Sequence, residues 1–262
     1  MIMLYTRRVV FGFLVSMLLL NSAANAQDLL KNLDLGSPAF TQAEMTRAAI
    51  EAAIGAGKPL DFSGKSLNGL DLSGLDFRGA TFRAARLNKA NLANANLEGA
   101  ILDQAWMLSA DLTNANLKEA NLFGTQLIGA TADGADFSRA VIAADLTNAS
   151  LKAARFDNAI LGADMKNQSM GLMRAVMKSA KLDGASFVGS DLSRTDLQFA
   201  KLAGANLKGA NLMGADLSGA DLTGADVTGT NFMNADVTSA TLQALTGADL
   251  MGAKNLDRAY RD

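Results

Sequence analysis

The dominant pattern in this chain is a large apolar residue at every fifth position from Phe62 onward. A first run of these centres reaches Ile142, and a second long run extends from Leu172 to Leu242. A small residue precedes most centres by two positions, Asp or Asn often stands between the two, and Gly frequently follows two positions after the centre. An α-helix repeats its apolar positions every 3.6 residues and a strand every two, so neither element alone explains the pattern.

A period of five is explained if each unit is a very short extended stretch followed by a corner. The centre and the small residue then point inward, the residues on either side of the centre point outward, and the fifth residue turns the chain. One such unit is too small to bury its own apolar side chain, so neighbouring units have to stack. The sequence therefore predicts an all-β solenoid with a continuous apolar interior.

The pattern is irregular between residues 142 and 172. The steps of five are interrupted by two steps of four, from Ile142 to Leu146 and from Leu161 to Met165. The second array then begins in the same frame as the first. We expect a bulge or small loop that leaves the core continuous. The alternative is two separately folded halves.

The first 26 residues have the features of a secretory signal peptide. Arg7 and Arg8 form a basic head, residues 9–20 are mostly apolar, and a small-x-small motif ends at Ala26. The apolar run is too short to cross a hydrocarbon layer, which requires about 20 helical residues. We expect cleavage between Ala26 and Gln27, no membrane span in the mature chain, and a periplasmic or secreted bacterial protein.

A helix over about 42–54 is predicted between the signal peptide and the repeats. Thr41 and Glu44 have the spacing of a capping box, and Gly55 or Gly57 supplies a stop signal. A stack of repeats exposes unpaired backbone at each end, so we expect this helix to cap the N-terminal end. The predicted domains are the signal peptide (1–26), the leader and capping helix (27–60), the repeat array (61–250, irregular around 142–172) and a C-terminal tail (251–262).

Units such as 110–114 (ADLTN), 205–209 (ANLKG) and 215–219 (ADLSG) resemble the pentapeptide repeat family, whose consensus is A-(D/N)-L-x-x. The resemblance covers nearly everything from residue 61 to residue 250. It implies a right-handed quadrilateral β-helix with four units per coil, in which residues twenty apart lie above one another. The 36 clear units then make nine coils, a rod about 43 Å long at a strand spacing of about 4.8 Å.

The composition excludes several kinds of chemistry. The chain has no Cys and no His, so disulfides, thiolate catalysis, Cys/His zinc sites and histidine relays are excluded.

Asp196, Asp216 and Asp236 should form an outward column that could attract cations or resemble the paired carboxylates of β-helix glycosidases. However, Asp commonly bonds the local backbone at turns, and uniform short units leave no loops to wall a cleft. We therefore expect no catalytic, metal-binding or cofactor-binding residues.

The charge balance argues against a nucleic-acid partner. The formal net charge is −2, and it becomes −4 once Arg7 and Arg8 are removed with the signal peptide. Basic residues form no stripe, because Asp221 follows Lys181 and Lys201 in the same predicted column.

Outward positions before the irregular segment carry large apolar side chains, and a contiguous patch of this kind usually marks a contact surface. The predicted patch has Ile101, Phe123 and Val141 on one side of the rod and Trp106, Leu108 and Ile128 on the next. It is a candidate site for an unknown protein partner or for a second copy of the chain in a homodimer. Alternatively, the loop around 142–172 or the N-terminal leader folds over it. Met173, Met213 and Met233 predict a second, smaller stripe.

These features favour an exported, non-enzymatic scaffold or protein-interaction module. The family resemblance implies one alternative, since characterised relatives mimic B-form DNA and bind type II topoisomerases. That function requires cytosolic residence and a strongly acidic surface, whereas this chain has a signal peptide and a small net charge. A carbohydrate-active β-helix enzyme is a third class, for which the sequence offers no cleft and no compact set of catalytic residues.

Overall fold

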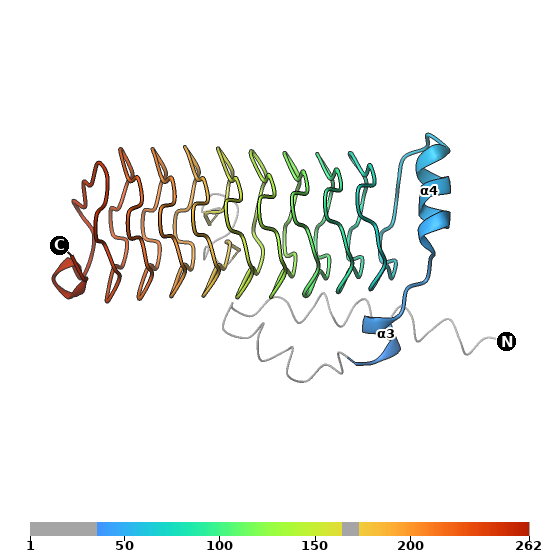
Figure 1. Ribbon diagram of the computed structural model, residues 1–262, viewed down its shortest axis with the longest axis horizontal. Helices are drawn as coiled ribbons and strands as arrows, with labels where there is room; N and C mark the ends of the chain where they lie inside the picture. The colour runs from blue at the N-terminus through green and yellow to red at the C-terminus, as the bar shows by residue number, and fades with distance from the viewer. Residues whose placement is uncertain (1–35, 164–172, 262) are drawn as a thin grey trace. The chain divides into compact units, whose positions relative to one another are not determined.

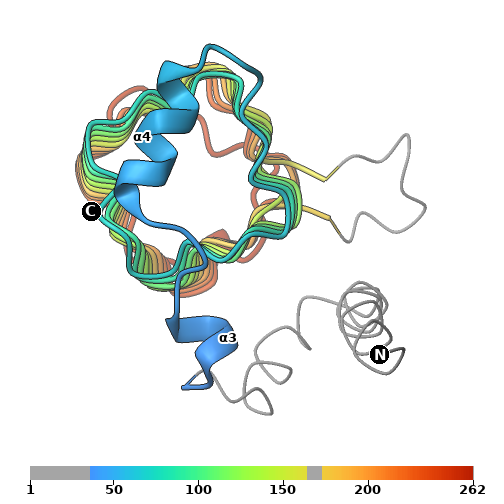
Figure 2. The ribbon, with the colours of Figure 1, turned by 90° about the vertical axis from the view of Figure 1, so that its right-hand side faces the viewer.

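The five-residue units close into a four-sided coil. In the regular coils the outward residue before each centre forms a parallel bridge with the residue twenty positions later, as Asp61 does with Thr81. Four columns of bridges result, one along each side of the solenoid, and each extended stretch is a single bridge residue (Figures 1 and 2). We name the sides by their first bridge residue: side A (Asp61), side B (Ser66), side C (Asp71) and side D (Asp76).

The computed structural model describes residues 36–163 and 173–261. The predicted signal peptide and the expected centres Met165 and Leu172 lie outside this range. The chain divides into two compact units, Met1–Ser37 and Pro38–Asp262, and every element named below belongs to the second.

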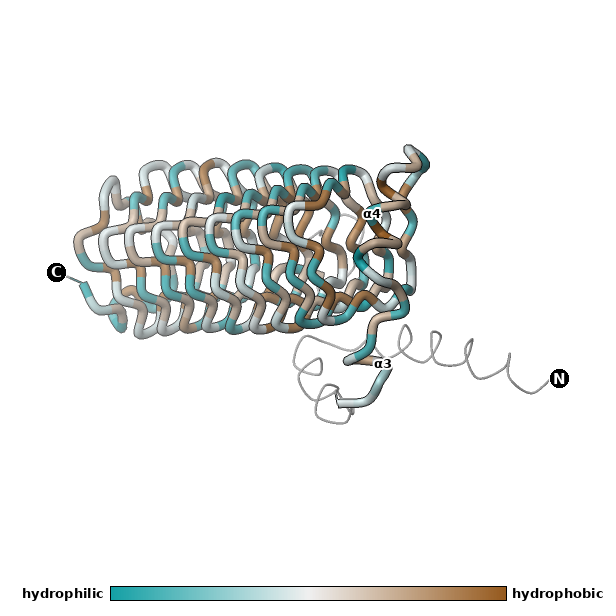
Figure 3. Tube along the Cα trace, turned by 45° about the vertical axis from the view of Figure 1, so that its right-hand side comes forward, coloured by the Kyte–Doolittle hydropathy of each residue, from teal (hydrophilic) through white to brown (hydrophobic). Residues whose placement is uncertain are grey.

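The predicted centres and small residues form the interior. Leu92, Leu112 and Leu212 are completely buried, as are the small residues next to them along the coils. The two kinds of position alternate with polar residues around each coil (Figure 3). Burial of each Leu contributes about 1.5–3 kcal/mol before the loss of chain entropy is counted. The prediction that every fifth residue lies in a dry interior is therefore confirmed.

The corners explain why Gly and Asn close so many units. In the unit centred on Leu92, the Ala95 N–H donates to the Leu92 carbonyl (3.0 Å), and Asn94 between them has a φ of 58°. A positive φ at the third residue is the feature of a type II turn, which Gly and Asn adopt with little strain. The fifth residue of each unit therefore turns the chain, as predicted.

The core is continuous through the irregular segment. Gln126 pairs with Asp145 instead of with residue 146, so the step of four shortens one coil by a residue. Asp145 in turn pairs with Val176, because the next coil carries an insertion between Ile160 and Val176 that includes residues 164–172 (Figure 1).

Three phenylalanines cross this region as one stack. The Phe137 and Phe156 rings are 4.9 Å apart at 4°, and the Phe156 and Phe187 rings are 4.8 Å apart at 5°. All three side chains are completely buried. The core is therefore continuous from the first array to the second, which contradicts two separately folded halves. The predicted loop itself falls largely on residues 164–172, outside the described range.

The N-terminal helix begins later than predicted. α4 spans Arg47–Gly55, not 42–54, and its N-cap is Thr46, whose hydroxyl accepts a hydrogen bond from the Ala49 N–H (3.3 Å). The predicted capping box is wrong, because Thr41 ends a separate short helix, α3 (Pro38–Thr41). Spacing alone could not show that the N-cap is Thr46, five residues after Thr41, because the choice depends on the backbone geometry.

α4 lies across the opening of the first coil (Figure 2). Its Ile50 side chain is completely buried within the same apolar core as the repeat centres. The glycine stop is confirmed, since Gly55 is the last helical residue and Gly57 follows with a φ of 63°.

The paired structure continues past the predicted boundary at residue 250. Lys254 pairs with Asp236 and Tyr260 pairs with Thr241, on either side of the short 3-10 helix η1 (Leu256–Arg258). Residues 251–261 therefore contribute a final partial coil.

Candidate interaction surfaces

The outward acidic column has a structural role. Asp196, Asp216 and Asp236 are successive members of the side B column, as predicted. Each carboxylate accepts a hydrogen bond from the backbone N–H two residues later, at 3.1, 3.0 and 2.9 Å. In the part of the chain that the structure describes, no group of three or more acidic side chains is arranged to hold a metal ion. The consensus Asp therefore stabilises the turn that follows it.

These local hydrogen bonds lower the pKa of the turn carboxylates. The Thr228 hydroxyl and N–H donate to Asp226 at 2.6 and 3.0 Å, and with Lys208 at 3.0 Å they lower the pKa of Asp226 to about 2. Hydrogen bonds from the side chain two residues later likewise lower the pKa of Asp61, Asp71, Asp76, Asp221 and Asp236. In contrast, burial raises the pKa of Asp145, despite a hydrogen bond from the Thr147 N–H (2.9 Å).

Stability should therefore fall as the pH is lowered from about 4 to about 2. A carboxylate whose pKa is lower in the folded state stabilises the fold above its unfolded pKa, and this contribution is lost as the pH falls through the folded pKa. Asp145 has the opposite sign, so Asp145→Asn is expected to raise the melting temperature at pH 7, whereas Asp226→Asn should reduce the acid sensitivity. Melting followed by circular dichroism from pH 2 to pH 7 measures both effects. A wild-type melting temperature that is unchanged between pH 4 and pH 2 would contradict this account.

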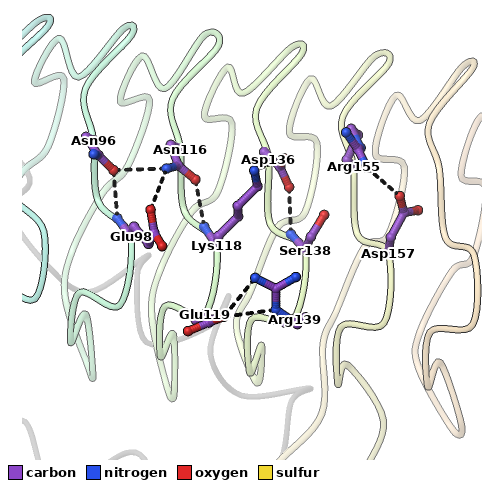
Figure 4. A network of polar contacts seen from close by, with 10 residues as sticks. All are labelled: Asn96, Glu98, Asn116, Lys118, Glu119, Asp136, Ser138, Arg139, Arg155 and Asp157. Carbon is purple, nitrogen blue, oxygen red and sulfur yellow. Dashed lines mark hydrogen bonds and ion pairs between the residues drawn. The ribbon is translucent and has the colours of Figure 1, made fainter.

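Side D carries charges of both signs in alternation. Lys118 pairs with Asp136 (3.3 Å) and Glu119 with Arg139 (2.8 Å), each pair joining neighbouring coils (Figure 4). Such exposed pairs contribute about 0–1 kcal/mol each.

Side A carries part of the predicted patch. Its bridge column contains, in order, Asp61, Thr81, Ile101, Asn121, Val141, Ile160, Asp191, Asn211 and Asn231. Ile101, Phe123 and Val141 share this side as predicted, but Ile101 and Phe123 are half-buried, whereas Val141 is 43% exposed. Ile160, which is 52% exposed and pairs directly with Val141, was missed. The shortened coil places it nineteen rather than twenty residues after Val141, so a count in twenties passes over it.

The predicted methionine stripe is correct only in part. Met213 and Met233 are 40% and 47% exposed on side A. Met173 does not join them, because Gly162 occupies the corresponding place, where a Cβ would collide with the Ser193 hydroxyl. We call the four exposed residues Val141, Ile160, Met213 and Met233 the side A stripe.

Side B carries the other half of the predicted patch. Trp106, Leu108 and Ile128 are half-buried on this side. The Trp106 ring contacts the ring of Phe40 in α3, with centroids 5.5 Å apart at an angle of 59°. α3 therefore covers part of Trp106. Most of the leader that was predicted as an alternative cover, residues 27–35, lies outside the described range.

Comparison with known proteins shows similarity over most of the array. The pentapeptide repeats family model matches residues 66–104, 107–142, 120–162, 172–209 and 210–254, in eight copies. One similar solved structure is HetL, a pentapeptide repeat protein involved in heterocyst differentiation regulation from the cyanobacterium Nostoc sp. strain PCC 7120. Its sequence is 33% identical to this chain. The match covers 82% of this chain and 97% of HetL, with a TM-score of 0.45.

Two further solved structures are less similar in sequence. QnrB1, a plasmid-mediated fluoroquinolone resistance protein, is 16% identical over 78% of this chain and 92% of its own, with a TM-score of 0.45. A pentapeptide repeat protein from the Arabidopsis thaliana thylakoid lumen is 26% identical over 50% of this chain and 66% of its own, with a TM-score of 0.25. No curated protein matches the chain.

Proposed function

This chain belongs to the pentapeptide repeat family. We propose that it is an exported, non-enzymatic protein-interaction module that binds its partner through the side A stripe. The adjacent pair Val141 and Ile160 carries this proposal. The two side chains belong to directly bridged residues and are 43% and 52% exposed. Large apolar side chains that lie together on a surface gain most from burial against a partner.

The rigid backbone beneath the stripe supports a binding role. The Val141 N–H donates to the Ala120 carbonyl (3.0 Å), and the Ile160 N–H donates to the Ala140 carbonyl (2.9 Å). Both side chains are thus fixed to the coil before them, and little backbone entropy is lost when a partner binds.

The features of residues 1–26 support export, with the mature chain beginning at Gln27. Within the described ranges, no helix has the length and hydrophobicity needed to cross a bilayer. We assign α4 the role of end cap. Its buried Ile50 supports this assignment, because an uncovered first coil would expose apolar surface and unpaired backbone.

Crosslinking and pull-down from the periplasmic fraction tests the proposal. We expect the double variant Val141→Ser/Ile160→Ser to capture at least tenfold less of the partner that the wild-type protein enriches, with little change in melting temperature. Phe199→Ser is the matched control, because Phe199 is 54% exposed at a corner away from side A; it should capture the partner normally.

Equal capture by the wild type and the double variant would refute the assignment of the stripe. Sedimentation of the purified protein checks whether the captured partner is a second copy of the chain. N-terminal sequencing of the exported protein tests cleavage before Gln27, and a cytosolic protein that retains residues 1–26 would refute export.

A further inference from the structure

The segment before α4 covers three successive coils of side B. We call residues 38–44 the strap. The Glu44 N–H donates to the Ser66 carbonyl (2.7 Å), the Arg86 Nη2 donates to the Glu44 carboxylate (3.2 Å), and Phe40 lies against Trp106. Ser66, Arg86 and Trp106 are consecutive members of the side B column. The strap therefore runs along side B from the first coil toward the third.

The strap is a short segment whose backbone is held at Ser66, where the hydroxyl donates to the Gln42 carbonyl, while its outer part is held by side-chain contacts. α3 has only four residues, far below the roughly 12–15 that an isolated helix needs in water. The Glu44 carboxylate, whose side chain is 47% exposed, pairs with Arg86 at 3.2 Å and with Lys65 at 3.9 Å. Exposed pairs of this kind contribute little to stability. The coils beneath are joined by their own backbone hydrogen bonds, so the strap can detach while the array stays folded.

Two polar groups of the second coil on side B, where the strap pairs with Arg86, are unsatisfied. The Arg86 Nε and the Asn88 Nδ2 are buried and have no hydrogen-bond partner among the described residues. Asn88 is only 5% exposed, and its Oδ1 accepts a hydrogen bond from the Leu108 N–H (3.0 Å). A buried donor without a partner loses its hydrogen bond to water and gains none in return, which is unfavourable. The strap is therefore an imperfect occupant of this surface.

We propose that side B around Trp106 is a second binding surface, occupied by the strap in the resting protein, for a partner polypeptide that carries an aromatic residue followed four positions later by a carboxylate. The spacing is that of Phe40 and Glu44. The partner's aromatic ring replaces Phe40 on Trp106, and its carboxylate accepts hydrogen bonds from both Nε and Nη2 of Arg86. Two-point pairing of this kind is stronger and more specific than the single bond to Glu44.

The half-buried Leu108 and Ile128 lie beyond Trp106 on the same side and extend the apolar contact. A backbone carbonyl of the partner can accept from the Asn88 Nδ2. The strap then acts as an internal competitor, so the apparent affinity for any partner is the intrinsic affinity multiplied by the fraction of time that the strap leaves the surface vacant. This surface is separate from the side A stripe, so the two proposals stand or fall independently.

A labelled strap peptide tests this proposal. The probe is a fluorescein-labelled peptide with the sequence of residues 37–45 (SPAFTQAEM), and its binding to the intact chain is followed by fluorescence anisotropy. We expect Phe40→Ala to bind the peptide at least tenfold more tightly than the wild type, because its own strap competes poorly. Glu44→Gln should bind severalfold more tightly, and Phe199→Ala, the control, should bind as the wild type does.

Two further readouts distinguish a binding surface from a purely structural contact. Trp106 is the only tryptophan in the chain, so acrylamide quenching reports its cover directly; quenching should increase in Phe40→Ala and decrease again when the peptide binds. Adding Arg86→Lys to Phe40→Ala should weaken peptide binding about tenfold, because Lys retains the charge but lacks the planar guanidinium group that can form two hydrogen bonds with one carboxylate. Equal affinity for the wild type, Phe40→Ala and Glu44→Gln, or binding to none of them, would overturn the proposal.

Discussion

Leu112→Asp is expected to abolish folding of the repeat array. Leu112 is completely buried among other repeat centres, and an unpaired charge in such a place costs several kcal/mol after relaxation. Natural domains are stable by only about 5–15 kcal/mol, and each coil here depends on its neighbours. Circular dichroism and limited proteolysis of the purified variant should show an unfolded chain.

Asn114→Asp is the matched control for this variant. It adds the same carboxylate at the exposed corner of the same unit, where the left-handed backbone (φ of 55°) suits Asp as well as Asn. We expect its melting temperature to stay close to that of the wild type. Cooperative melting of Leu112→Asp at the wild-type temperature would contradict the inward assignment of the centres.

Phe156→Ala is expected to destabilise the fold by about 3–5 kcal/mol, the usual cost of removing a fully buried aromatic side chain. Phe156 is the middle ring of the stack with Phe137 and Phe187, so the substitution leaves a cavity beside the insertion and removes two ring contacts. Equilibrium unfolding in guanidinium chloride measures the loss. A change below about 1 kcal/mol would show that the core is not packed through this region.

Phe199→Gly provides the comparison for an exposed aromatic residue. Phe199 has a φ of 59° at its corner, its ring lies over Gly219, and Lys178 lies 6.0 Å from the ring centroid. Relief of the left-handed backbone is worth about 1–2 kcal/mol. The loss of the cation–π contact and the flexibility of glycine cost about 0.5–1 kcal/mol each. These terms offset one another, so the variant should stay within about 1 kcal/mol of the wild type.

The interior of the array could be predicted from the sequence because its period is local and repeated. Every unit carries the same information, so the inward centres, the turning fifth residue and the step of four at Ile142 could all be located by counting. The same counting failed at Met173, because apolar residues within the insertion imitate repeat centres at nearly the correct spacing. It also passed over Ile160, whose column is set by the shortened coil.

The contact between Phe40 and Trp106 could not have been derived from spacing. It joins residues 66 positions apart through a segment without any repeat, and no local pattern specifies where such a segment lies. The sequence did identify Trp106 as unusual, since a large apolar residue at an outward position requires either a partner or a cover. Side B shows that the chain supplies the cover itself.

The side A stripe has Val141 and Ile160 before the insertion and Met213 and Met233 after it, so it requires the coils to stay in register there. Amide hydrogen exchange of the intact protein measures this most directly. The N–H groups of Leu146, Leu151 and Phe156 donate to carbonyls of residues 176, 181 and 186, at 2.7–2.8 Å across the insertion. We predict that these amides exchange as slowly as those of Leu92 and Leu212 in the regular coils. Rapid exchange at Leu146, Leu151 and Phe156, with protection kept in the coils on either side, would contradict a single continuous solenoid.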